Sequence, residues 1–307
     1  MRVVFVGKGS RCAAAMKAVH TAGHEIVLVM VESGGKADPA TAAASELGLA
    51  QAPNGPLSMR ERMKLIATTT ADVTVLAGFS QIVPDEFGRL TSFGAVNLHA
   101  GRLPQYRGSS PLNWALINGE SSFGISVIRV DQGLDTGAVL AEAEFVIGCN
   151  DTVADLHETA NLEFGKLLTV SLDALSRSVV GREQQAYRGT YWPLRFPEDG
   201  FIVWDMMAAN EVHNLVRALA NPYPNATTRF RGQMARIVRT RLADEDFRGV
   251  AGRIYRITGG SLLVAASDRC LWVDDAVFAD SGVSISSVAV RYDEFATCRG
   301  FIRSGIQ

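Results

Sequence analysis

Cysteines, an excess of basic charge and long apolar runs are all missing or scarce in this sequence. There are four cysteines, too scattered for a disulfide scaffold and without the CxxC or CxH spacing of zinc ligands: Cys12, Cys149, Cys270 and Cys298. No stretch is long and apolar enough to span a membrane, and the first residues lack the layout of a signal peptide. We therefore expect no metal site, no membrane partner and a reducing cytoplasm as the compartment.

Charge and length set wide limits on function. The formal net charge is −2 for 307 residues, so neither sign dominates. Chains that bind nucleic acid or anionic membranes usually carry a basic excess, which this chain lacks. Hydrophobic residues make up 47% and charged residues 20%, as in ordinary globular proteins. The length allows one large domain or two.

The first thirty residues predict a β-α-β unit. Arg2–Val6 is a short apolar strand, Ser10 is the expected cap of a helix that continues through Thr21, and Glu25–Val31 is a second strand. Gly7 and Gly9 match two glycines of a GxGxxG motif, but a cysteine occupies the third place. We interpret the turn as a tight strand–helix connection, although Glu32 could mimic a ribose-binding acid, and we expect no dinucleotide.

The elements that follow predict an α/β fold with a Rossmann-like, mostly parallel sheet, because a β-α-β unit joins parallel strands by a right-handed crossover. Helices are expected at 39–47, 59–68, 109–118 and 151–175, and strands at 73–77, 95–99, 124–130 and 139–147. The polar stretch 176–185 suits a connection between domains.

The remainder predicts a second, smaller domain. A helix is expected at 210–220, followed by five short β-rich runs: 227–230, 235–239, 252–257, 262–266 and 270–274. Five such strands suggest a small β-barrel of the OB kind. The expected division is a domain at 1–185, a junction at 186–202 and an OB-like domain at 203–307.

The segment from Asn97 to Gly137 contains the polar side chains that are the best candidates for a catalytic site. Asn97 and His99 are two residues apart in an expected strand, so their side chains point to the same side. Asp135 lies in a loop bounded by glycines, where the backbone can turn its carboxylate toward a strand end. An amide donor, an imidazole and a carboxylate are the groups that acyl transfer needs.

Four segments in this region carry a family resemblance. They are Asn97-x-His99, the LPxYRG pattern of Leu103–Gly108, the NWALINGE run of Asn113–Glu120 and the DxGxDTG loop of Asp131–Gly137. Together, in this order and spacing, they resemble the folate-dependent formyltransferases. The resemblance implies an N-terminal catalytic domain with the OB-like domain behind it, N10-formyltetrahydrofolate as the formyl donor and a primary amine as the acceptor.

The same resemblance assigns the site residues. It implies Asn97, His99 and Asp135 as the catalytic set. Asn97 would donate a hydrogen bond to the tetrahedral oxygen, and loss of one such donor typically costs about 2.7–4 kcal/mol. His99 would move the amine proton to the leaving folate nitrogen, a contribution on the order of 100- to 10,000-fold. Asp135 would orient the imidazole.

The folate is expected to bind between two loops. By resemblance, the segment Phe79–Val83 lines the pterin pocket largely through backbone groups, and the 101–108 loop lies beside it. The assigned residues are Phe79, Gln81, Ile82, Val83, Leu103 and Pro104. The alternative interpretation of Phe79, Ile82 and Val83 is that they belong to the hydrophobic core.

The acceptor is less clearly indicated. The TYWPxRxPEDG segment at 190–200 resembles the junction of nucleotide-sugar N-formyltransferases, so we favour a nucleotide-linked amino sugar. Tyr191, Trp192 and Arg195 could stack on its base or meet its diphosphate, or could pack the junction. The sequence leaves the oligomeric state open, with a homodimer among the options.

Other functions stay open. Methionyl-tRNA formylation is the first alternative, because five arginines in the expected barrel could contact phosphates or could form a solvated strand face: Arg229, Arg231, Arg236, Arg239 and Arg241. Formylation of a hydroxyornithine-type amine and hydrolysis of the formyl donor use the same three groups. A folate- or nucleotide-binding module without activity is the non-enzymatic alternative.

Overall fold

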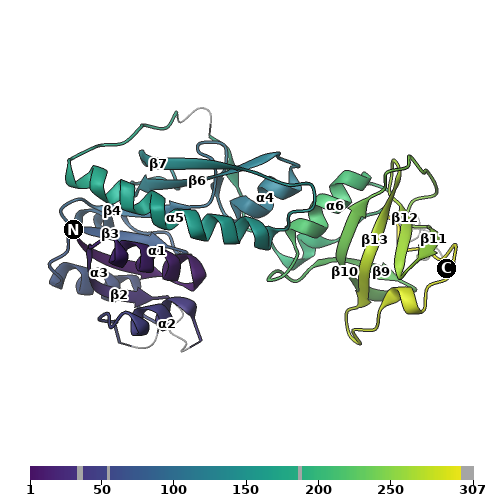
Figure 1. The fold of residues 1–307 in the computed structure, drawn as a ribbon, viewed down its shortest axis with the longest axis horizontal. Coiled ribbons are helices and arrows are strands. Elements are labelled where there is room, and N and C mark those ends of the chain that lie inside the picture. Colours follow the sequence, from purple (N-terminus) through teal and green to yellow (C-terminus); the bar gives the residue numbers. More distant parts are fainter. Residues whose placement is uncertain (33–36, 54–55, 186–188, 299–307) are drawn as a thin grey trace. The chain divides into compact units, whose positions relative to one another are not determined.

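The computed structural model describes residues 1–32, 37–53, 56–185 and 189–298 (Figure 1). The chain forms two compact units. The first unit comprises residues 1–111, 122–145 and 157–193, and the second comprises 112–121, 146–156 and the chain from 194 onward. The domain boundaries expected from the sequence, at 185 and 202, stay a prediction. Parts of the expected junction and OB-like domain, residues 186–188 and 299–307, lie outside the described residues.

A six-stranded sheet forms the centre of the first unit, in the order β2-β1-β3-β4-β6-β7. The strands are β1 (Arg2–Gly7), β2 (Glu25–Val31), β3 (Val73–Ala77), β4 (Ala95–His99), β6 (Ser122–Arg129) and β7 (Val139–Val146). β1 pairs in parallel with β2 and β3, and β3 with β4, whereas β4 and β6 are antiparallel. The predicted α/β class with a mostly parallel sheet is confirmed.

Helices α1 (Gly9–Thr21), α2 (Pro39–Glu46), α3 (Met59–Thr68), α4 (Pro111–Ile117) and α5 (Val153–Ser176) occupy the predicted segments, and η1 (Asp85–Arg89) is a short 3-10 turn. Ser58 and Glu61 form a capping box at the start of α3. The expected cap at Ser10 is wrong, because α1 already begins at Gly9. The backbone N–H of Gly9 instead donates to the carboxylate of Asp38, over 3.0 Å, and the same carboxylate caps α2.

The second unit is built on an antiparallel sheet in the order β11-β12-β13-β10-β9. Its elements are η3 (Pro197–Gly200), α6 (Ala209–Ala218), β9 (Ala226–Phe230), β10 (Gln233–Leu242), β11 (Ile254–Thr258), β12 (Ser261–Ala265), β13 (Cys270–Phe278) and η4 (Ile285–Ser287). The five strands occupy the five segments predicted for them. Each neighbouring pair is antiparallel.

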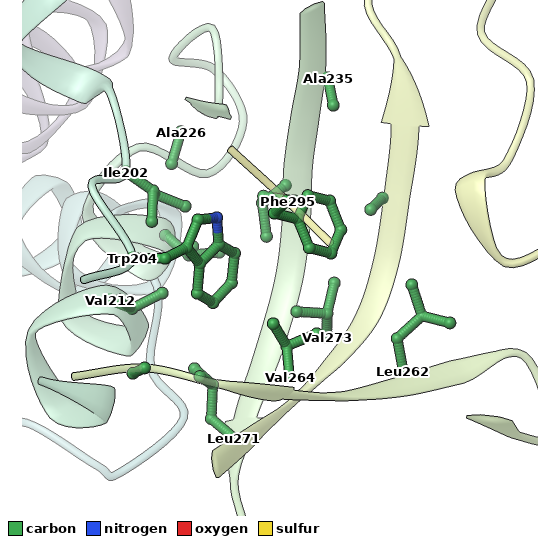
Figure 2. Close-up of a cluster of buried hydrophobic side chains, with 14 of the residues drawn as sticks. Ile202, Trp204, Val212, Ala226, Ala235, Leu262, Val264, Leu271, Val273 and Phe295 are labelled. Carbon is green, nitrogen blue, oxygen red and sulfur yellow. The ribbon is translucent and has the colours of Figure 1, made fainter. Parts of the chain in front are cut away.

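Mostly aliphatic side chains surround Trp204 and Phe295 in the core of the second unit (Figure 2). Trp204 stacks on Phe295 with ring centroids 5.2 Å apart, and its indole N–H donates to Thr228. The buried Trp therefore keeps a partner for its single polar group.

A short segment joins the two edges of this sheet. The carbonyl of Asp293 accepts from the N–H of Ile254, the first residue of β11, and the N–H of Ala296 donates to the carbonyl of Arg229 in β9. Two isolated β-bridges also join this segment to the sheet: Arg253 pairs with Glu294, and Phe230 pairs with Phe295. One segment thus pairs with residues at both edges of the sheet. The assignment to the OB type stays a prediction.

Candidate active site

Strand β4 delivers the first two polar side chains. It pairs with β3 on one side and β6 on the other, so its backbone is fixed in both directions, with Asn97 opposite Leu76 and Ile128. Asn97 is half-buried and His99 is buried, with 5% of its surface exposed. Because side chains alternate along a strand, the amide and the imidazole lie on the same side of the sheet, as the sequence predicts.

The carboxylate of Asp135 lies between these two groups. Its Oδ1 is 3.4 Å from Asn97 Nδ2 and 3.5 Å from His99 Nδ1, and its Oδ2 accepts a hydrogen bond from the Gly108 N–H over 2.9 Å. The side chains of His99 and Asp135 are only 6% and 9% exposed, so water screens their interaction weakly. The structure brings together the three residues predicted as the catalytic set, and their roles stay a prediction.

The second ring nitrogen of His99 faces the 101–108 loop. His99 Nε2 lies 2.5 Å from the carbonyl oxygen of Tyr106. Gly101 permits this arrangement, because a Cβ there would lie 2.6 Å from His99 Nε2 and 2.5 Å from the Tyr106 oxygen. The imidazole is therefore enclosed by the Asp135 loop on one side and the Tyr106 loop on the other.

The contacts that hold the Asp135 loop from behind were not predicted from the sequence. Gln184 donates both N–H groups of its amide to the carbonyl oxygens of Asp135 and Gly137, over 2.9 and 2.8 Å. Its oxygen accepts from Arg107 Nε and Nη2, over 3.1 and 2.8 Å. Gln184 lies in the stretch interpreted only as a domain connection, and no local pattern in the sequence marks it.

The loop after β3 contains most of the predicted folate residues. Phe79 is half-buried and packs with Val83 in a core cluster, and the guanidinium of Arg62 lies over its ring at 5.4 Å. Ile82, in contrast, is 82% exposed. Phe79 and Val83 therefore contribute in part to the hydrophobic core, whereas the side chain of Ile82 is available to a ligand.

Gln81 helps to anchor this loop to the end of β2. Its amide donates to Glu32 over 3.4 Å, Ser80 donates to Glu32 over 2.6 Å, and Lys8 Nζ lies 2.8 Å from the same carboxylate. Burial disfavours the charged form of Glu32, but the hydrogen bonds from Lys8 and Ser80 outweigh it and hold the pKa of the carboxyl below its usual value. Glu32 is thus engaged with this loop.

The two folate residues predicted in the 101–108 loop are buried. Leu103 is 4% exposed and packs with Ile128 and Val139, and Pro104 is also buried. A ligand beside this loop would meet its backbone groups rather than the Leu103 side chain.

The residues predicted to bind the acceptor have other contacts. Trp192 stacks on Tyr106 with centroids 5.5 Å apart, and its indole N–H donates to the Gln105 carbonyl. Tyr191 is 51% exposed. In the second unit, the guanidinium of Arg195 lies 4.9 Å from the Trp114 ring centroid, and burial lowers its pKa although Asp199 opposes this.

The described residues show neither a membrane-spanning helix nor a cluster of metal ligands. No helix in the described ranges is long and apolar enough to cross a membrane. Among the same residues, no group of three or more His, Cys, Asp or Glu side chains could hold a metal ion. The four cysteines carry no disulfide.

Comparison with known proteins identifies the family. Residues 1–170 match the model of the formyl transferase family, and residues 196–286 match the formyl transferase C-terminal domain. A methionyl-tRNA formyltransferase of Solibacter usitatus is 32% identical over 280 residues, which cover 88% of this chain and 89% of that protein.

Solved structures share the fold at lower identity. An N-formyltransferase from Helicobacter canadensis, in complex with folinic acid and dTDP-3-aminofucose, has a TM-score of 0.69 at 16% identity, covering 88% of this chain and 97% of its own. The methionyl-tRNA formyltransferase of Clostridium thermocellum has a TM-score of 0.56 at 19% identity, covering 81% and 96%. The family models and the curated relatives show that the chain belongs to the formyl transferase family, and that it is an enzyme that transfers formyl groups from formyltetrahydrofolate.

Proposed function

We propose that Asn97, His99 and Asp135 catalyse transfer of the formyl group from N10-formyltetrahydrofolate to a primary amine. The observation that carries the proposal is the position of the Asp135 carboxylate, 3.4 Å from the Asn97 amide nitrogen and 3.5 Å from His99 Nδ1. A buried carboxylate this close to an imidazole fixes the orientation of the ring.

Each residue has a separate task in the reaction. The lone pair of the amine forms a bond to the formyl carbon, and the carbonyl electrons move to the oxygen. Asn97 has two N–H groups, so one can donate to Asp135 while the other donates to this oxygen. His99 accepts the proton that the amine loses and gives it to N10 as the carbon–N10 bond breaks. The products are a formamide and tetrahydrofolate.

The loop after β3 suits the pterin ring. Ile82 presents an exposed apolar side chain, while the bonds of Ser80 and Gln81 to Glu32 hold the loop in place. A flat heterocycle needs such an apolar contact together with edge hydrogen bonds, which backbone groups at the strand ends can supply. The buried loop at Leu103 and Pro104 would contribute backbone contacts only.

For the acceptor we propose a nucleotide-linked amino sugar. Of the five arginines that could have formed a phosphate-binding face, four have partners within the second unit. Arg231 pairs with Asp293 at 2.7 Å and Arg241 with Asp274 at 3.1 Å, and two others donate to backbone carbonyl groups. The formal net charge of −2 also gives no overall basic excess of the kind that favours binding to a nucleic-acid backbone.

Methionyl-tRNA is the second candidate acceptor. It is favoured by the curated relatives, among them the protein of Solibacter usitatus, which are named methionyl-tRNA formyltransferases. A tRNA acceptor predicts binding that weakens steeply with salt, whereas a nucleotide sugar with one diphosphate predicts a shallow dependence.

An acceptor screen tests the proposal. Release of tetrahydrofolate from N10-formyltetrahydrofolate is measured with dTDP-3-aminofucose, with initiator methionyl-tRNA, with hydroxyornithine and with water alone. Turnover with the nucleotide sugar supports the proposal. Turnover with tRNA alone would overturn the nucleotide-sugar proposal and assign methionyl-tRNA as the acceptor. Turnover with water alone would indicate a hydrolase, and folate binding without any turnover would indicate a binding module.

Three finer expectations accompany this function. The free thiols of all four cysteines are compatible with the reducing cytoplasm expected as the compartment. A homodimer and the domain division at 185 and 202 are kept as proposals, which size measurement in solution and limited proteolysis can test.

A further inference from the structure

Gln184 occupies a fully matched hydrogen-bonding position behind the Asp135 loop. Arginine side chains only donate, so the amide oxygen of Gln184 must face Arg107, and its nitrogen must then face the carbonyl groups of Asp135 and Gly137. All four contacts are between 2.8 and 3.1 Å. The orientation of the amide is therefore determined by its neighbours.

Arg107 is itself held firmly. Only 2% of its surface is exposed, and its guanidinium lies over the Tyr191 ring at 5.5 Å. Gly189 makes room for it, because a Cβ there would lie 2.2 Å from Arg107 Nη1. The two-residue strands β5 (Arg107–Gly108) and β8 (Tyr191–Trp192) pair in parallel at this point.

Arg107 reaches Asp135 by two routes. Its side chain orients Gln184, which holds the Asp135 backbone. The next residue, Gly108, donates its N–H to the Asp135 carboxylate over 2.9 Å. Backbone and carboxylate of Asp135 are thus both attached to a single rigid side chain and its neighbouring peptide.

Asp135 needs such support because of its backbone conformation. Its φ is +54°, in the left-handed region that non-glycine residues seldom adopt. A residue in this conformation persists where surrounding contacts hold it, and the two bonds from Gln184 supply those contacts on either side of Thr136.

We propose that Gln184 is a positioning residue for formyl transfer, which keeps the Asp135 carboxylate against His99 and Asn97, and that Arg107 fixes the orientation of Gln184. The inference rests on the proposed function, because it requires Asp135 to be part of the catalytic set. It goes beyond that function in assigning a task to the segment that precedes Tyr191, which contributes no group to the reacting atoms.

The substitution Gln184→Glu is the sharpest test. It keeps the size of the side chain and gives Arg107 a charged partner, but it removes both N–H donors from the carbonyls of Asp135 and Gly137. Displacement of a catalytic group by 1 Å costs about 100-fold in rate, so we expect kcat to fall by roughly 10- to 100-fold while KM for the folate changes little. Gln185→Glu, the same change at the exposed neighbouring residue, is the matched control.

Two readouts separate positioning from a general structural contribution. Formyl transfer is measured with dTDP-3-aminofucose, and with hydroxylamine as a small probe amine, in a cycle of Gln184→Glu and Asp135→Asn. If Gln184 acts through Asp135, Gln184→Glu should lower kcat no further in a protein that already carries Asp135→Asn. A general structural effect would instead lower kcat by the same factor in both backgrounds. A crystal structure of the Gln184→Glu protein should show the Asp135 carboxylate displaced from His99 by about 1 Å.

The outcomes for the inference and for the proposed function are distinct. An Asp135→Asn protein with near-normal kcat would overturn the proposed function itself. A severe loss in Asp135→Asn with normal kcat in Gln184→Glu, or an unmoved carboxylate in its crystal structure, would overturn the inference alone. Gln184→Ala replaces the glutamate variant in the same measurements if the latter does not bind folate and is misfolded.

Discussion

The Nε2 atom of His99 lies 2.5 Å from the carbonyl oxygen of Tyr106. A neutral imidazole has one N–H, so it can donate either to this carbonyl or to the carboxylate of Asp135, but not to both. When the ring donates to Asp135 through Nδ1, Nε2 is the atom left to accept a proton, and the Tyr106 carbonyl blocks it. In the proposed mechanism, proton transfer through Nε2 therefore requires this contact with the Tyr106 carbonyl to open.

Gly101→Ala tests how closely this loop fits the imidazole. The new Cβ would approach the Tyr106 oxygen to 2.5 Å and His99 Nε2 to 2.6 Å, both closer than real Cβ contacts. Since displacement by 1 Å costs about 100-fold in rate, we expect kcat to fall by roughly that factor. Gly88→Ala is the control, because its Cβ would meet nothing closer than 3.5 Å. Equal activity of the two variants would show that the loop does not constrain His99.

Substitution of Asn97 or His99 should lower kcat without lowering folate affinity. Asn97→Ala should lower kcat by about 100- to 1,000-fold, as expected for loss of one oxyanion donor. His99→Ala should lower it by about 100- to 10,000-fold. Folate affinity, measured by quenching of tryptophan fluorescence, should stay within a few-fold in both, because neither group is needed to hold the pterin.

Asn150→Ala, at an exposed asparagine, is the control for these two variants. A large loss of folate affinity in Asn97→Ala or His99→Ala would assign the residue to donor binding instead of to the chemical step. Near-normal kcat in either variant would contradict the catalytic role proposed for it.

His157 predicts a loss of stability in weak acid. Burial, and secondarily the positive charge of Arg11, lower its pKa from 6.5 to about 4. Between these values the unfolded chain binds a proton that the folded chain does not, so stability is full above pH 6.5 and decreases as the pH falls toward 4, by about 3 kcal/mol in total. Thermal unfolding at several pH values between 7.5 and 4.5 measures this.

The variant His157→Gln should flatten that pH dependence. Some slope will remain, because burial also lowers the pKa values of His24 and His213. His20→Gln, at an exposed histidine, should keep the full slope. If His157→Gln and the unmodified protein lose stability equally between pH 6.5 and 4.5, the burial of a neutral His157 is not the cause.

The strands of the first unit could be predicted from the sequence because their signal is local. The runs at 73–77 and 95–99 are short and apolar, they are bounded by polar residues and glycine, and their predicted limits agree with the structure. The alternation within β4 also predicted that Asn97 and His99 share one side. Convergence with Asp135, 38 residues away from Asn97, came from the family resemblance and not from periodicity.

Contacts across long separations could not be predicted in this way. Arg107 and Gln184 are 77 residues apart, and no sequence pattern around either residue indicates the other as its partner. The burial of Leu103 is of the same kind, since it packs with Ile128 and Val139, and nothing in the LPxYRG segment shows which neighbours cover it. Backbone groups of a helix end or loop that have no hydrogen-bond partner nearby in the sequence find one in a distant segment, which only the fold brings close.

The cap of α1 is the clearest such case, and it gives a stability prediction. Asp38 accepts from the N–H groups of Gly9 and Ala40, at 3.0 and 2.8 Å, so it serves two helix starts at once. Asp38→Ala removes both acceptors and should lower the free energy of unfolding by about 2 kcal/mol, while Asp38→Asn, which keeps one acceptor oxygen, should lose less. Ser10→Ala, at the position where the sequence alone suggests the cap, should change it by under about 0.5 kcal/mol. Urea unfolding of the three variants measures the difference, and a larger loss from Ser10→Ala than from Asp38→Ala would show that the helix is capped locally after all.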